Sequence, residues 1–203
     1  KAMKQSVNWL IVIVASAGGI DALTQALSGL AKDLPVTVII VQHMKADYPT
    51  HLHEHLERSA ALPVRLAKNG LNLEAGVAYL AVPGQHLRLK DSTLALDCGP
   101  SVNYVRPSAD VLFSSAAEAF GSHVIGIVLS GTGRDGTKGC QEIKAKGGII
   151  IAQKDALYPD MPQSAIEIGL IDYVLPVSEI PGKIALLVWQ GNQNNGGYSG
   201  RQK

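Results

Sequence analysis

Short runs of apolar residues, many of them β-branched, alternate along this 203-residue chain with segments that repeat apolar residues at helical spacing. The apolar runs cover Val7–Val14, Val36–Val41, Val124–Leu129, Ile149–Ala152 and Tyr173–Leu175. The helical patterns cover Gly19–Leu30, Thr50–Ala60, Ser108–Phe120, Gly136–Lys146, Met161–Ile168 and a last stretch near Ser178–Gln190. Continuous apolar runs are typical of strands buried on both faces, so the pattern predicts an α/β fold: a doubly wound, mostly parallel sheet with helices on both faces.

Residues Pro63–Gly99 depart from this alternation. Short strand-like pieces are separated there by Asn-Gly, Pro-Gly and Asp-Ser turns, and they cover Val64–Leu66, Val77–Ala81, Leu87–Leu89 and Leu94–Leu96. This spacing favours a short antiparallel β excursion from the sheet and not a second domain. We therefore expect one domain over residues 1–190, followed by a flexible polar tail or linker over the glycine-rich residues 191–203.

Composition narrows the class of protein. Hydrophobic residues make up 46% of the chain and charged residues 17%, which is enough apolar material for one sizeable core. A net charge of +1, with the charges scattered, gives no reason to expect a nucleic acid or an anionic membrane as partner. With no membrane-length apolar stretch, no signal peptide and no C-x-x-C pattern, we expect a cytoplasmic protein without membrane insertion. Cys98 and Cys140 are then expected to be small buried hydrophobic side chains.

The first candidate for chemistry is Ser16, which ends the first apolar run and is followed by Gly18 and Gly19 before a helical pattern begins. The glycines allow a sharp turn, and the N-terminus of the next helix directs N–H groups to the same place. A serine in this position is a candidate nucleophile beside a site for a developing oxyanion.

Two further apolar runs end near residues that complement a serine nucleophile. His43 follows the second run, and Asp135 follows Val124–Leu129. The carboxyl ends of parallel strands meet at one edge of a sheet, where a histidine can take the serine proton and an aspartate can orient the histidine. Each residue also has a structural interpretation. Ser16 can cap a helix, His43 can bond to backbone at a strand end, and Asp135 can cap the helix that follows it.

Several motifs occur in a fixed order along the chain. They are Ala15-Ser-Ala-Gly-Gly19, Gln42-His-Met44, Asn103-Tyr-Val-Arg-Pro-Ser-Ala-Asp-Val-Leu-Phe113, Ser130-Gly-Thr-Gly-Arg-Asp-Gly136, Gly147-Gly148 with Ala152-Gln153, and Met161-Pro162 with Ala165. Together they resemble the catalytic domain of the chemotaxis protein-glutamate methylesterases, the CheB family. The resemblance runs from about Val7 to Leu187.

The resemblance implies a serine hydrolase that demethylates glutamate methyl esters on chemoreceptors, and also deamidates glutamine, during bacterial chemotaxis adaptation. It implies a catalytic triad of Ser16, His43 and Asp135, with no metal or organic cofactor. Ala17, Thr132 and Arg106 would serve the oxyanion or the substrate. The implied partners are the cytoplasmic helices of methyl-accepting chemoreceptors. A receiver domain or a fused methyltransferase is a further partner in the family, and we expect neither within this chain.

The chain departs from the family pattern beside the nucleophile. Val14 stands where a glycine is usual and could crowd the turn behind Ser16, Ala17 lacks a hydroxyl that many members carry, and Thr132 stands where methionine is common. None of these changes removes a triad group, so they bear on the rate more than on the reaction.

Two other classes of function stay open. One is a catalytically weak domain that binds a receptor or a partner protein. The other is a nucleotide-binding α/β module, because Gly131–Gly136 satisfies G-x-G-x-x-G and Asp155 follows some twenty residues later, although that fingerprint belongs on a first βα unit.

Lesser candidates have simpler interpretations. His51, His53 and His55 are better explained as a solvated helix face than as a metal site. Ser108 and Ser130 are weaker nucleophile positions than Ser16, and His86 either lines the cleft or closes a turn. These six residues complete the list of candidates that the sequence offers.

Overall fold

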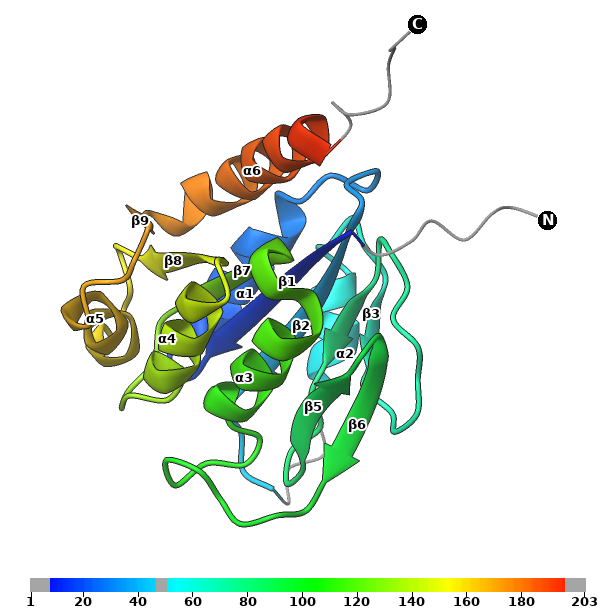
Figure 1. Cartoon of the computed structure of the whole chain (residues 1–203). Coiled ribbons are helices and arrows are strands. Elements are labelled where there is room, and N and C mark those ends of the chain that lie inside the picture. The colour runs from blue at the N-terminus through cyan, green and yellow to red at the C-terminus, as the bar shows by residue number, and fades with distance from the viewer. Residues whose placement is uncertain (1–7, 47–50, 196–203) are drawn as a thin grey trace, which may run out of the picture.

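The structure, a computed structural model that describes residues 8–46 and 51–195, is built on a central sheet with helices on both faces (Figure 1). The seven strands of this sheet have the order β3-β4-β2-β1-β7-β8-β9, and each neighbouring pair is parallel. They are β1 Trp9–Ala15, β2 Val36–Gln42, β3 Val64–Leu66, β4 Ala78–Leu80, β7 Val124–Val128, β8 Ile149–Gln153 and β9 Tyr173–Leu175. The predicted doubly wound α/β fold is confirmed. Val7 and Thr50, which began two predicted elements, lie outside the described residues.

Helices cover the sheet because its central strands are apolar on both sides. All residues of β1 and β2 are buried, and alternate residues of β1 belong to two different cores, Ile11 and Ile13 to one and Val12 and Val14 to the other. Figure 1 shows α3 and α4 in front of the sheet and α1 and α2 behind it. The helices are α1 Gly19–Ser28, α2 Leu52–Glu57, α3 Ala109–Phe120, α4 Thr137–Ala145, α5 Asp160–Glu167 and α6 Ile180–Asn195, with 3₁₀ turns at Gly121–His123 and Val177–Glu179. None of the described helices is long and apolar enough to cross a membrane.

The predicted short antiparallel excursion is confirmed, but two of the four pieces assigned to it belong to the parallel sheet. Only β5 (His86–Lys90) and β6 (Thr93–Asp97) pair antiparallel, as a separate two-stranded sheet against α3. The pieces Val64–Leu66 and Val77–Ala81 instead supply β3 and β4, which extend the parallel sheet beyond β2. Neither piece reveals its pairing partner, because three residues carry too little pattern to distinguish a parallel edge strand from half of a hairpin.

The last helix continues beyond its predicted end at Gln190 to Asn195, so residues 191–195 belong to α6 and not to the expected tail. Gly191 does not stop the helix. It lets α6 approach the first strand, because a Cβ at this position would collide with the ring of Trp9. Asn192 accepts a hydrogen bond of 3.3 Å from Trp9 Nε1 at the same contact. Residues 196–203 lie outside the described residues.

The two cysteines differ in their surroundings. Cys140 is fully buried in α4, as expected, and burial together with the charge of Asp110 raises the pKa of its thiol to about 12. Cys98 is exposed, in the loop after β6, so the expectation that it is buried is wrong. No periodic pattern of apolar residues surrounds Cys98 in the sequence, so its exposure could not be inferred.

Candidate active site

The three residues proposed for catalysis follow three adjacent strands. Ser16 comes after β1, His43 after β2 and Asp135 after β7, and β1 lies between the other two strands. The register carries on past the strand ends, since His43 N–H donates to Ala15 O at 3.0 Å and Ser16 N–H donates to Ser130 O at 2.9 Å. The chain leaves β1 towards β2 and later returns on the other side of β1 as β7. Ligand sites of open α/β sheets occur at such a switch point.

The turn after Ser16 depends on two glycines. Gly18 has φ +67°, a left-handed conformation that glycine adopts without strain, and it caps α1. A Cβ on Gly19 would lie 2.6 Å from Ala15 Cβ and 2.9 Å from Gln42 Oε1, so the helix can begin this close to the sheet only without a side chain. Ser16 itself is half-buried, and among the described residues its hydroxyl has no hydrogen-bond partner. The hydroxyl is therefore held by backbone geometry alone.

A second loop packs directly on the nucleophile turn. Ser130 is buried, and its hydroxyl donates to Ala17 O at 2.8 Å while accepting from Tyr158 N–H at 3.0 Å. Ser130 thus connects the loop after β1 with the loop between β8 and α5. A Cβ on the next residue, Gly131, would sit 2.7 Å from Ser16 Cβ, which shows how closely the two loops approach. Thr132 follows as an exposed residue.

Backbone donors on both loops remain unused. The N–H groups of Ala17, in the first loop, and of Thr132, in the second, form no hydrogen bond with any described residue. Unpaired N–H groups on loops next to a serine are the kind of donor that stabilises an oxyanion.

His43 and Asp135 form a short contact, with 2.7 Å between His43 Nε2 and Asp135 Oδ2. The side chain of His43 is 10% exposed and that of Asp135 is 3% exposed, so little water competes for this contact. Asp135 also accepts hydrogen bonds from the start of α3, at 2.6 Å from Ser108 Oγ and 2.6 Å from Ala109 N–H. Asp135 therefore caps α3, and not α4, the helix that follows it.

These donors set the charge of Asp135. Burial raises the pKa of its carboxyl, but hydrogen bonds from His43, Ser108, Ala109 and Asn103 outweigh burial and hold the pKa below its ordinary value. An ionised Asp135 can only accept, so the His43 proton is on Nε2 and Nδ1 keeps a lone pair for a proton from Ser16. This use of the ring nitrogens is the reverse of that in the chymotrypsin-type triad.

Val14 does not crowd the turn behind Ser16. It is fully buried, and its carbonyl keeps the strand register by accepting from Leu129 N–H at 2.9 Å. The side chain points to the α3 side of the sheet, where its Cγ1 lies 3.3 Å from the position of a Cβ on Gly136. Because Gly136 has no side chain, the extra volume of Val14 is taken up there.

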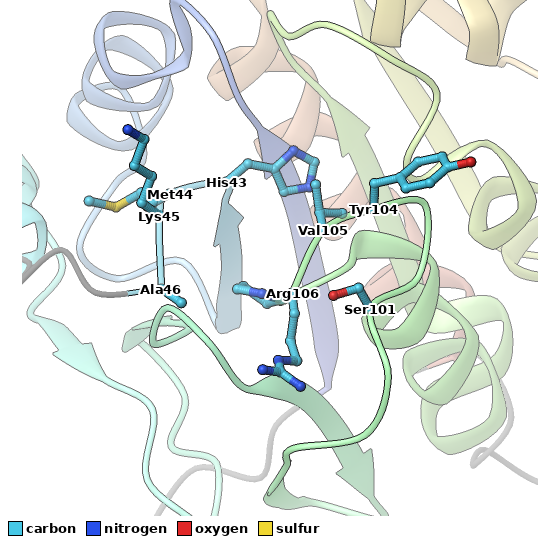
Figure 2. A pocket seen from close by; sticks show the side chains of 9 residues that line it. His43, Met44, Lys45, Ala46, Ser101, Tyr104, Val105 and Arg106 are labelled. Atoms are coloured by element: carbon cyan, nitrogen blue, oxygen red, sulfur yellow. The ribbon is translucent and has the colours of Figure 1, made fainter.

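A pocket of about 250 Å³ opens beside the His43 ring. It is lined by His43–Ala46 after β2 and by Ser101 and Tyr104–Pro107 from the loop before α3. Arg106, expected to reach an acidic substrate, donates from Nη1 to Cys98 O at 3.0 Å and Gly99 O at 2.8 Å. Figure 2 shows its guanidinium directed away from His43. Arg106 therefore shapes one wall of the pocket while its charged group is engaged within the protein.

Two other histidine predictions can be compared with the structure. His86 is buried, donates from Nε2 to Pro100 O at 2.8 Å and accepts from Ser108 N–H at 3.2 Å. Of the two interpretations left open for it, it closes a turn beneath the site. His51 is exposed and lies 3.3 Å from Glu54. Within residues 8–46 and 51–195, no group of three or more potential metal ligands is present.

The sequence offered no role for three polar residues that hold the site together. Gln42 Nε2 donates to Ser16 O at 2.9 Å, and Gln153 Oε1 accepts from Ser130 N–H at 2.8 Å. Both glutamines are the last residue of an apolar strand and are 5% exposed, so a polar residue at a buried strand end was the available signal. Asn103 Nδ2 donates to Asp135 Oδ1 at 2.8 Å, and no local pattern indicates this contact.

The glycine-rich segment that suggested a nucleotide site serves a different purpose. Gly131–Gly136 follows β7, which comes after several other βα units, and its carboxylate Asp135 is directed to α3 and His43. Asp155, the expected ribose ligand, accepts from Gln153 Nε2 at 3.2 Å and Val177 N–H at 3.0 Å. The geometry gives the nucleotide interpretation no support.

Fold and site together describe an α/β protein with a serine, a histidine and an aspartate grouped at one sheet edge. The family model for CheB methylesterase matches residues 11–184, and the chain belongs to this family. It is 36% identical over 194 residues to a protein-glutamate methylesterase/protein-glutamine glutaminase of Pyrococcus horikoshii, covering 92% of this chain and 53% of the relative. A second protein of that description, from Anaeromyxobacter dehalogenans, is 40% identical over 174 residues, covering 85% of this chain and 51% of the relative.

A solved structure agrees with this family membership. The crystal structure of the Thermotoga maritima CheB methylesterase catalytic domain is similar with a TM-score of 0.85 and 34% identity, covering 90% of this chain and 100% of that one. The chain spans about half the length of the two curated relatives. The Thermotoga structure is that of a catalytic domain, and the match covers all of it.

Proposed function

We propose that this chain is a protein-glutamate methylesterase domain, in which Ser16 is the nucleophile, His43 the general base and Asp135 the residue that orients His43. The relatives are named for hydrolysis of glutamate methyl esters and of glutamine side-chain amides, and we propose both reactions here. The observation that carries the proposal is the 2.7 Å contact between His43 and the buried Asp135 at the strand end next to Ser16.

The reaction begins when Ser16 Oγ attacks the γ-carbonyl carbon of the methylated glutamate. His43 Nδ1 takes the serine proton, and ionised Asp135 stabilises the resulting imidazolium through Nε2–H. The carbonyl oxygen gains negative charge, for which the unpaired N–H groups of Ala17 and Thr132 are the candidate donors.

The tetrahedral intermediate then loses methoxide, which leaves as methanol with the proton from His43. Water enters, His43 removes one of its protons, and the resulting hydroxide attacks the acyl-enzyme carbonyl. Collapse returns Ser16 Oγ as the leaving group, which recovers the proton from His43, and the product is a free glutamate. A glutamine substrate follows the same steps with ammonia as the first leaving group. The residues described here supply each proton transfer in this scheme.

The substrates are proposed to be the cytoplasmic helices of methyl-accepting chemoreceptors, which places the enzyme in the cytoplasm. The pocket beside His43 supports a side-chain substrate, because it opens next to the proposed base and is walled by two loops. A receiver domain or a methyltransferase joined to this domain is proposed as a regulatory partner, in line with the greater length of the relatives.

Methanol release from methylated receptor fragments tests the proposal. The wild-type chain, Ser16→Ala and Ser130→Ala form the informative set, because Ser130 is the neighbouring serine whose hydroxyl bonds only to backbone. We expect methanol release to be lost in Ser16→Ala and to persist in Ser130→Ala, measured at a temperature at which both variants are folded. A wild-type chain that binds the fragments without releasing methanol would indicate a binding domain instead.

A further inference from the structure

Asn103 lies in an unusual turn at the rim of the site. Asn103 and Tyr104 both have positive φ values, +53° and +63°, and Val102 and Val105 exchange two backbone hydrogen bonds of 3.1 Å across them. Two consecutive residues with positive φ are costly unless they are glycine, and asparagine tolerates this conformation better than other side chains. The turn therefore fixes where the Asn103 amide is placed.

The amide of Asn103 bridges two carboxylates. Its Nδ2 donates to Asp135 Oδ1 at 2.8 Å and to Asp110 Oδ2 at 2.6 Å. The other oxygen of Asp110 accepts from Gly139 N–H at 2.7 Å, which fixes that carboxylate between α3 and α4. One neutral donor thus stands between the proposed triad carboxylate and a second acid.

The surroundings offer these two acids little positive charge. His43 contacts Asp135 directly. His86 is linked to Asp135 through Ser108, whose N–H donates to His86 Nδ1 and whose hydroxyl donates to Asp135 Oδ1. Among the residues that the structure describes, no lysine or arginine forms an ion pair with either acid. Burial raises the pKa of Asp110 against the hydrogen bonds from Gly139 and Asn103, and the neighbouring charge of Asp135 raises it further. On the α4 side, burial and the charge of Asp110 raise the pKa of the Cys140 thiol to about 12, so this thiol is neutral.

We propose that Asn103 is a positioning residue of the triad, whose amide allows Asp110 and Asp135 to be ionised side by side and directs Asp135 towards His43. This inference rests on the proposed function. Without the amide, the two carboxylates lose their shared donor and one proton is drawn to the pair. A shared proton weakens the hydrogen bond that Asp135 accepts from His43 Nε2–H. His43 is then a weaker base for the proton of Ser16.

Asn103→Gly is the informative variant, because glycine keeps the positive φ and removes only the amide. Asn103→Asp adds a third acid at the same place. Asn72→Gly is the matched control, since Asn72 is an exposed asparagine whose side chain accepts from Thr93 Oγ1 at 2.9 Å, remote from the site.

The assay is the pH dependence of Ser16 labelling by a fluorophosphonate, which reports activation of the serine without a receptor substrate, together with methanol release. We expect labelling of Asn103→Gly to be at least about tenfold slower than in the wild type near neutral pH, since the hydrogen bonds from Asn103 Nδ2 to both carboxylates are lost. Asn72→Gly should label at the wild-type rate. The rate for Asn103→Asp relative to Asn103→Gly should fall as pH rises, because the new carboxyl can donate to Asp135 only while it is protonated.

Three results would overturn the inference. Labelling of Asn103→Gly within twofold of the wild type at each pH would mean that water replaces the amide, as the exposure of this residue allows. Equal losses in both Asn103 variants at each pH would mean a structural effect on the turn. Absence of Ser16-dependent labelling in the wild type would remove the triad and the inference together. In contrast, labelling that depends on Ser16 and Asn103 without methanol release would support the inference and reject the proposed substrate.

Discussion

Replacing Asp135 by asparagine changes the charge of the site while nearly preserving its shape. The carboxylate has four close donors, two on each oxygen, and an amide can accept on only one side. If the new amide nitrogen faces α3 and His43, the buried Ala109 N–H loses its acceptor and the His43 proton must move to Nδ1. If it faces the other way, it opposes the N–H₂ of Asn103. Either orientation leaves a donor unpaired.

The structure sets the size of both expected effects. A buried donor without a partner costs about 1–3 kcal/mol, and the loss of a negative charge at the start of α3 costs about 0.3–1 kcal/mol. We therefore expect Asp135→Asn to lower the free energy of unfolding by about 1–4 kcal/mol. Catalysis should fall much further, since a histidine in the wrong tautomer cannot take the serine proton, and this change lowers kcat by about 10⁴-fold in a serine protease.

Urea denaturation measures the first quantity and methanol release from methylated receptor fragments measures the second. Asp172→Asn is the matched control, because Asp172 pairs with Lys144 at 2.8 Å and bonds to Ile150 N–H, at the opposite end of β8 from the site. This half-exposed pair should contribute at most about 1 kcal/mol. The reasoning is refuted if Asp135→Asn keeps more than a tenth of the wild-type kcat, or unfolds within about 0.5 kcal/mol of the wild type.

Three other measurements follow from the same structure. Gly19→Ala should lower the free energy of unfolding by about 1–3 kcal/mol because its Cβ has no room, whereas Gly182→Ala in α6 meets no atom within 4 Å and should be neutral or stabilising by thermal denaturation. A thiol reagent at pH 8 should modify only the exposed Cys98 in the native protein, and reaction of Cys140 without unfolding would contradict its burial and raised pKa. Because the pKa of Asp135 is lowered in the folded state, its stabilising effect is present above about pH 4 and is lost as pH falls through the folded pKa. The free energies of unfolding at pH 6 and pH 3 should therefore differ less in Asp135→Asn than in the wild type.

The proposed site could be inferred in outline from the sequence because its residues follow recognisable strands. Ser16 and His43 each stand directly after a long apolar run, and parallel strands bring their carboxyl ends to one edge. The contacts that hold the site together could not be inferred in this way. Asn103 lies 32 positions from Asp135, and it reaches the carboxylate only because a positive-φ turn before α3 folds back over the end of β7.

Strand pairing shows the same division at the level of the fold. The long runs of β1, β2 and β7 have apolar residues on both faces. Strands of this kind are typical of a parallel sheet covered on both sides, whatever their order in the sheet. The three-residue strands β3 and β4 carry no such indication. Only the pairing of β4 with β2, and of β3 with β4, decides that they extend the sheet. Gly191 likewise marks the start of a tail in the sequence pattern, and only its contact with the ring of Trp9 shows that it belongs to α6.

By itself, the sequence determined the alternation of strands and helices, the buried parallel sheet and the order of the motifs that mark this family, because these depend on local patterns of residue type. Tertiary structure alone decided which helix Asp135 caps, which ring nitrogen of His43 stays available and where the volume of Val14 goes. Those features depend on distances between segments far apart in the chain. Such distances follow from packing, which local pattern does not encode.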